Sequence, residues 1–325
     1  MYRPQLFVAA IILAGCSQQP VWISTPPKVL CFEHADKGCL SELIAQNVGA
    51  EQPGPNQLKS FRYTRAVMAS AGIDEPSSLR LLSADIGKVM CIIPDTDFVL
   101  AGQEVERAKQ KNFDVAIRNA LGIHDEDAKL FALAHIATFA SRANDEGAIG
   151  KTLSILNQED KAAYMEALQS RLVTLLAIGD LERAKSLQEL LLSFYTASPD
   201  NTMAIARVAI SYVTAGHVAD ANEFLRNASF QVPELRTEDV ARLLSIMVNA
   251  AKGEHPSPQD FYDFSSDEMR LQAYVQLALF YERSGNAGLS RKTSSDLSRF
   301  VQKSSLKVGR AATAQALSRV LIETY

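Results

Sequence analysis

The five histidines are the side chains of this chain best suited to bind a metal ion or to transfer a proton near neutral pH. They are His34, His124, His135, His217 and His255. No two of them have the i, i+4 spacing that places metal ligands on one helix face. The chain also lacks H-E-x-x-H, a G-x-S-x-G nucleophile elbow and a G-x-x-x-x-G-K-[ST] phosphate loop. The sequence therefore predicts no catalytic residue, no metal site and no cofactor.

A serine and a lysine near the end of the chain have the spacing of a nucleophile and its base. Ser304 precedes Lys307 by three positions, as in a serine–lysine pair. The accompanying motifs of that chemistry are missing. Acidic groups such as "HDEDAK" and "NQEDK" are typical of helix starts, where negative charge complements the helix dipole. The chain is therefore predicted not to be an enzyme.

Two of the four cysteines frame a short loop, "CFEHADKGC", from Cys31 to Cys39. In an oxidising compartment this loop favours a disulfide, worth roughly 2–3 kcal/mol in the chain-entropy model. The alternative is a metal site made of both thiols and His34, which lacks a nearby fourth ligand. Cys91, within "VMCII", is predicted to be a buried apolar thiol.

The remaining cysteine ends the apolar run "FVAAIILAGC" at Cys16. This run is too short to cross a bilayer, which needs roughly 20 apolar residues. Arg3, the apolar middle and the small residues before Cys16 are typical of an export signal. The segment "LAGC" resembles the lipobox of bacterial lipoproteins.

That resemblance implies a signal peptide over residues 1–15, cleavage before Cys16, and acylation of that cysteine with lipids such as palmitate. Residues 16–30 carry three prolines and are expected to form an extended tether. Ser17 stands where enteric lipoproteins retained at the inner membrane carry Asp, so the resemblance implies an outer-membrane protein facing the periplasm.

The net charge and the length of the chain limit its expected partners and its domain organisation. The 325 residues carry a net charge of −4, with Lys and Arg dispersed along the chain, so nucleic acid is not an expected partner. The part after the signal peptide is longer than one compact core usually holds. Two domains or an elongated repetitive array are the alternatives.

Helical patterning runs through the chain. Residues 31–98 are predicted to form a small N-terminal helical region, interrupted by "EQPGPN" and with Gly72 as a helix C-cap. From residue 99 onward apolar residues recur at spacings of three and four, the helical period. The predicted fold class is all-α.

A repeat is the most informative feature of residues 99–300. Turn residues recur at spacings of 33, 35, 37, 37 and 32: Lys111, Asn144, Gly179, Gly216, Gly253 and Gly285. Gly and Asn are the residues preferred for a left-handed turn that ends a helix.

The period resembles that of tetratricopeptide repeats, whose units are antiparallel helix pairs. The best match covers residues 202–235. Its residues of the expected classes are Ile205, Val208, Ala209, Tyr212, Gly216, Val218, Ala221, Ala228 and Pro233. In the last unit Tyr274, Leu277, Ala278, Tyr281 and Gly285 repeat the first half of the pattern. The resemblance implies a right-handed α-solenoid of helical hairpins, with a capping helix over residues 301–325.

In tetratricopeptide proteins the first helix of each unit lines a concave groove that binds a partner. Carried over position by position, the groove residues are Phe131, Thr138, Arg142, Glu166, Gln169, Val173, Met203, Ala206, Ile210, Gln272, Val275, Leu279, Glu282 and Arg283. Their mixture of apolar, amide and charged side chains favours a protein segment as ligand. The set lacks the Lys and Asn grouping with which some relatives bind a terminal carboxylate.

These features together predict a lipid-anchored adaptor or scaffold that binds other envelope proteins. Envelope assembly, pilus secretion piloting and regulation of cell-wall synthases are the roles that the resemblance implies. The alternatives are an enzyme of the cell wall or its accessory subunit, and a structural surface lipoprotein.

Overall fold

The computed structural model of the chain describes residues 35–50, 55–73, 96–195, 202–231, 237–304 and 309–325. These residues form fourteen α-helices, one short 3-10 helix and no strand, so the prediction of an all-α fold is confirmed for them. The helices are α1 (Lys37–Gly49), α2 (Pro55–Ser70), α4 (Asp97–Lys109), α5 (Phe113–Leu121), α6 (Glu126–Ala143), α7 (Glu146–Glu159), α8 (Lys161–Ala177), α9 (Leu181–Tyr195), α10 (Thr202–Thr214), α11 (Val218–Gln231), α12 (Thr237–Ala251), the 3-10 helix (Pro258–Phe261), α13 (Asp267–Arg283), α14 (Ala287–Ser304) and α15 (Arg310–Thr324).

The turns between these helices follow the repeat. All six turn residues identified in the sequence have a positive φ: Lys111, Asn144, Gly179, Gly216, Gly253 and Gly285. At the end of α8 the Gly179 N–H donates to the Leu176 carbonyl at 3.1 Å, and the Asp180 N–H donates to the Leu175 carbonyl at 2.9 Å. These bonds satisfy carbonyls that the helix itself leaves unpaired. The six residues therefore have the left-handed conformation that the sequence predicted for them.

Aspartates begin three consecutive helices of the array. Asp125, Asp145 and Asp160 each accept a hydrogen bond from the backbone N–H three residues later, at 2.9–3.0 Å. They cap α6, α7 and α8 and place negative charge at the positive end of the helix dipole. The acidic groups "HDEDAK" and "NQEDK" are helix starts, as the sequence indicated.

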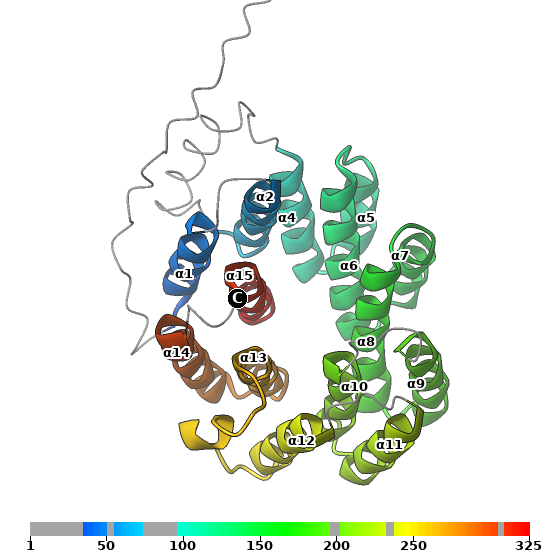
Figure 1. The fold of residues 1–325 in the computed structure, drawn as a ribbon. Coiled ribbons are helices and arrows are strands. Elements are labelled where there is room, and N and C mark those ends of the chain that lie inside the picture. Colours follow the sequence, from blue (N-terminus) through cyan, green and yellow to red (C-terminus); the bar gives the residue numbers. More distant parts are fainter. Residues whose placement is uncertain (1–34, 51–54, 74–95, 196–201, 232–236, 305–308) are drawn as a thin grey trace, which may run out of the picture.

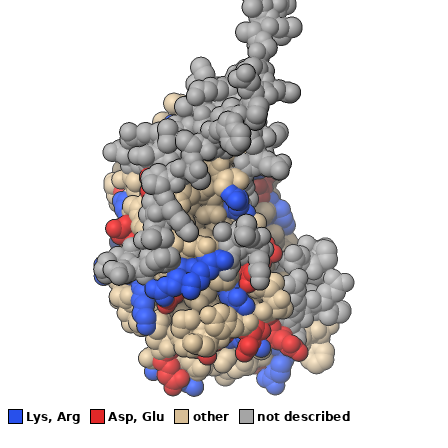
Figure 2. Space-filling view, turned by 60° about the vertical axis from the view of Figure 1, so that its left-hand side comes forward, with Lys and Arg blue, Asp and Glu red and all other residues tan. Residues whose placement is uncertain are grey.

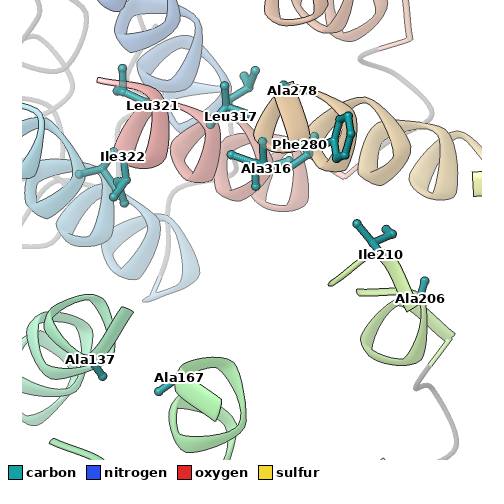
Figure 3. Packing of buried hydrophobic residues seen from close by; sticks show 14 of the residues in the cluster. Ala137, Ala167, Ala206, Ile210, Ala278, Phe280, Ala316, Leu317, Leu321 and Ile322 are labelled. Atoms are coloured by element: carbon teal, nitrogen blue, oxygen red, sulfur yellow. The ribbon is translucent and has the colours of Figure 1, made fainter. Parts of the chain in front are cut away.

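The helices form an inner and an outer row (Figure 1). α2, α4, α6, α8 and α10 pack side by side in chain order, while α5, α7, α9 and α11 each pack on the outside of the preceding helix. Small residues permit this close packing. Ala137 of α6 and Ala167 of α8 are directed at each other (Figure 3), and Ala209 of α10 is fully buried. The Tyr212 hydroxyl reaches the neighbouring hairpin and contacts Gln188 of α9.

The two ends of the described chain meet. α15 turns inward and packs against α1, α2 and α13, which closes the helices into a ring (Figure 1). The Tyr325 hydroxyl donates to the Ala35 carbonyl at 2.8 Å, and the Ala35 N–H donates to Ser295 Oγ of α14 at 3.0 Å. The sequence predicted an elongated array with local contacts; these contacts join residues 290 and 260 positions apart.

The physical reason for this closure lies in the composition of α15. Ala316, Leu317, Val320, Leu321 and Ile322 are all buried, and they cover more than one face of the helix. A helix that is apolar on several sides must pack on several sides. Figure 3 shows Ala316 and Leu317 beside Ala278 and Phe280 of α13.

The final segment also differs from the prediction in its bounds. A capping helix was expected over residues 301–325, but α14 continues to Ser304 and the last helix begins at Arg310. Among the described residues, no helix is long and apolar enough to span a membrane.

Candidate functional site

Two adjoining cavities lie inside the ring, between the inner helices and α15. The outer cavity has a volume of about 330 Å³, and its lining includes Tyr63 of α2, Met165 of α8, Gln272 of α13 and Gln315 of α15. The inner cavity has a volume of about 40 Å³ and is lined by residues of α6, α8, α10, α13 and α15. The two cavities share five lining residues: His135, Glu166, Gln169, Arg207 and Arg319. We call them together the chamber.

Glu323 of α15 is the most strongly held charge of the chamber. Its carboxylate accepts hydrogen bonds from Arg283 at 2.7 Å and from Arg319 at 3.3 Å, and it also contacts Arg142. Only 9% of its side chain is exposed. Burial alone would raise the pKa of Glu323, but the three guanidinium groups hold it well below its ordinary value of 4.5. Glu323 is therefore ionised over the whole range in which proteins are usually folded.

Glu166 of α8 carries the second negative charge. Its side chain lines both cavities inside the ring and is exposed to solvent there. Burial raises its pKa, but Arg319, Arg207 and His135 outweigh that effect and lower it. Burial also lowers the pKa of His135, so the imidazole is neutral near pH 7.

The chamber has more positive than negative charge. Arg207, Arg283 and Arg319 line it, and Arg142 joins them through Glu323. Among the described lining residues, three arginines therefore face the two carboxylates of Glu166 and Glu323. In contrast, the face of the molecule in Figure 2 carries basic and acidic side chains together where it is not covered by grey atoms.

Half of the predicted groove residues line the chamber. These seven are Thr138, Glu166, Gln169, Val173, Ile210, Gln272 and Arg283. They come from α6, α8, α10 and α13, the helices that the sequence predicted to be the first of each unit. Their partner-binding role remains a prediction.

The other seven predicted groove residues have different environments. Ala206, Val275 and Leu279 are buried in the apolar core, and Met203 packs against it. Phe131 is buried between Tyr63 and His135, with ring centroids 5.3 and 4.6 Å away. Glu282 is half-buried and does not line either cavity.

Arg142 and Arg283 require a correction. Their repeat positions predicted that both point into an open groove, where a partner would meet their charges. Both instead bind Glu323, and only 30% and 23% of their side chains are exposed. The helix that follows the repeats occupies the position in which a ligand was expected.

Several chamber residues were not predicted, namely Tyr63, His135, Arg207, Gln276, Arg319 and Glu323. One pattern in the sequence pointed to two of them. Arg319 and Glu323 are four positions apart on the last helix, whose neighbouring positions are almost all apolar. A charged pair on such a helix indicates a polar interior contact rather than a solvated face.

The predicted sites near the N-terminus fall largely outside the described residues. Cys16, Cys31, His34 and Cys91 lie there, together with the signal peptide and the tether. Cys39, at the start of α1, is disulfide-bonded, and its pairing with Cys31 remains a prediction. Lys307 also lies outside. In the described ranges no three His, Cys, Asp or Glu side chains are grouped so as to hold a metal ion.

No similar protein indicates the chemistry of the chamber. The chain matches no protein-family model, no curated protein and no solved structure.

Proposed function

We propose that this protein is a lipid-anchored adaptor of the bacterial envelope that binds a segment of another envelope protein in the outer cavity. Its array is a right-handed solenoid of tetratricopeptide-like hairpins. The regular left-handed turns and the inner and outer helix rows support this architecture. The apolar run ending at Cys16 supports the lipid anchor and an outer-membrane location facing the periplasm.

One observation carries the adaptor role: α15 fills part of the concave face but leaves the outer cavity open. Three amides, Gln169, Gln272 and Gln315, line this cavity beside apolar Met165 and Ala204. Amide groups can both donate to and accept from a peptide backbone, and the apolar patches suit its side chains. A volume of about 330 Å³ suits a few residues of an extended segment rather than a whole helix.

The carboxylates of the chamber do not favour the alternative of a cell-wall enzyme. Glycoside hydrolysis needs one carboxyl group with a raised pKa as general acid. Both Glu166 and Glu323 have lowered pKa values because arginines surround them. Neither is suited to donate a proton near neutral pH.

Site-specific photo-crosslinking in intact cells tests the adaptor role. A photoreactive amino acid replaces Gln272 in the outer cavity, and in a matched strain it replaces Arg118, which is exposed on outer helix α5. We expect a discrete crosslinked envelope protein from position 272 and none from position 118. Equal products at both positions, or none at 272, would contradict binding in the chamber.

Lipidation is tested separately with Cys16→Ala. The variant should lose acyl mass and leave the outer-membrane fraction, because no other anchor is predicted. Mass spectrometry of the purified protein and density fractionation of the envelope measure both effects. An acylated, membrane-bound Cys16→Ala protein, or inner-membrane enrichment of the wild type, would overturn the proposed anchoring.

A further inference from the structure

The inner cavity has donors that nothing in the described structure satisfies. Gln276 of α13 lines it, is only 3% exposed, and its Nε2 has no hydrogen-bond partner among the described residues. The Nε of Arg283, on the same helix, is likewise buried and without such a partner. Buried N–H groups are nearly always paired, so two of them beside one cavity indicate a missing acceptor.

The charges around the same cavity indicate what that acceptor carries. Among the described residues that line it, three arginines, Arg207, Arg283 and Arg319, outnumber the two glutamates, Glu166 and Glu323. The positive charges of the arginines repel one another, because the protein interior screens charges less than water does. The concave shape of the site also concentrates their positive electrostatic potential. Additional negative charge is the complement of such a site.

The cavity's dimensions limit the group that enters. About 40 Å³ is enclosed by five helices, which leaves room for a group of a few heavy atoms. Phosphate and carboxylate are compact anions of this size with several acceptor oxygens, which planar guanidinium and amide donors bind well.

We infer that the inner cavity binds a compact anion of phosphate or carboxylate chemistry, with Gln276 and Arg207 among the groups that hold it. This site goes beyond the adaptor role: it adjoins the outer cavity and shares Arg207 with it, but Gln276 lines the inner cavity alone, and the site does not require a protein partner. The anion bridges α10, α13 and α15, and so stabilises the closed ring.

Isothermal titration of the full mature chain in detergent tests this inference. The probes are inorganic phosphate, succinate and the neutral analogue succinamide. We expect phosphate or succinate to bind and to raise the melting temperature, while succinamide does neither. Comparing the affinities for phosphate and for succinate shows which of the two kinds of anion the cavity prefers. If neither anion binds, or if succinamide binds as tightly as succinate, the inference is wrong.

Matched variants locate the site. Gln276→Leu removes the buried donor while keeping a side chain of similar size, and Gln259→Leu is its exposed control. Arg207→Gln removes one charge of the chamber, with Arg118→Gln as the control on the outer surface. We expect at least tenfold weaker anion binding for Gln276→Leu and Arg207→Gln, and wild-type binding for both controls.

Gln276→Leu also separates binding from folding. Replacing an unpartnered buried amide by an apolar group does not weaken the fold, so its melting temperature without ligand should not fall. If Arg207→Gln fails to fold, Gln276→Leu decides alone. Unchanged affinity in Gln276→Leu would place the anion elsewhere and overturn the assignment.

Discussion

At the scale of single residues, Glu323 connects parts of the chain that are far apart in sequence. Its carboxylate is bound by Arg142, 181 positions away, and by Arg283, 40 positions away. Removing one member of a buried ionic network leaves the other charges unpaired, which costs more than the pair itself contributes. The same carboxylate makes the stability of the protein depend on pH.

Glu323→Gln should lower the free energy of unfolding at pH 7 by about 3–5 kcal/mol. Because the folded-state pKa of Glu323 lies below its unfolded value, its contribution is fully present above pH 4.5 and is lost as the pH falls. The difference between wild type and variant should therefore shrink at about pH 3. Urea unfolding followed by circular dichroism at both pH values measures it.

The control for this experiment is Glu189→Gln, which removes an exposed carboxylate from α9. An exposed charge change typically alters stability by less than about 0.5 kcal/mol. If Glu323→Gln changes the free energy of unfolding equally little at pH 7, or by the same amount at both pH values, then the three arginines do not stabilise the Glu323 carboxylate.

The second prediction at this scale concerns the disulfide of Cys39. We expect its partner to be Cys31, because the loop between them is short and closes readily. Peptide mapping of the exported protein without reductant identifies the crosslinked pair directly. Free thiols at both positions, or a bond from either one to Cys91, would refute the pairing.

Among the helices, the close contact between α2 and α4 depends on Gly102, which has no side chain. A Cβ added at Gly102 of α4 would lie 2.2 Å from the Ala66 carbonyl oxygen and 2.6 Å from the Ala69 Cβ. These atoms belong to the helix opposite and cannot move aside without separating the two helices. The first pair of inner helices is therefore fixed by a glycine.

Gly102→Ala should lower the free energy of unfolding by about 3 kcal/mol or more, the upper end of what overpacking costs. Gly150→Ala in α7 is the matched control, since a Cβ there meets no atom within 4 Å. That variant should be more stable by about 0.5–1 kcal/mol, because alanine favours a helix more than glycine does. Thermal unfolding that ranks the two variants in the opposite order would contradict the packing.

At the scale of the whole molecule, α15 determines whether the array is open or closed. It packs against α1, α2 and α13 and supplies Arg319 and Glu323 to the chamber. Without it, α1 would lose its largest contact and the chamber one of its walls. The proposed adaptor role and the proposed anion site both depend on this helix, which follows the predicted repeats.

Deletion of residues 309–325 should open the ring. We expect faster amide hydrogen exchange in α1 and a larger radius of gyration in small-angle X-ray scattering, because the ends of the chain no longer meet. Tyr325→Phe is the mild control: it removes one hydrogen bond to Ala35, worth roughly 1 kcal/mol, and should leave the ring closed. Unchanged protection of α1 in the deletion variant would disprove the role given to α15.

The local features of this protein could be predicted from its residues. The helical period predicted an all-α fold, and the six turn residues from Lys111 to Gly285 predicted where helices reverse. Seven of the predicted groove residues line the chamber, and their role in binding a partner stays a prediction. Turns and helix faces depend on residues a few positions apart, so a one-dimensional pattern contains them.

The position of α15 inside the ring could not be predicted in this way. Arg142 and Arg283 have the sequence pattern of exposed groove charges, and nothing near them indicates a partner within the chain. Their partner, Glu323, belongs to a helix that reaches them only after the ring has closed. Such a contact depends on the summed angles between many packed helices, a quantity that no local pattern records. The chamber, its surplus of arginines and its unpaired Gln276 donor follow from that closure.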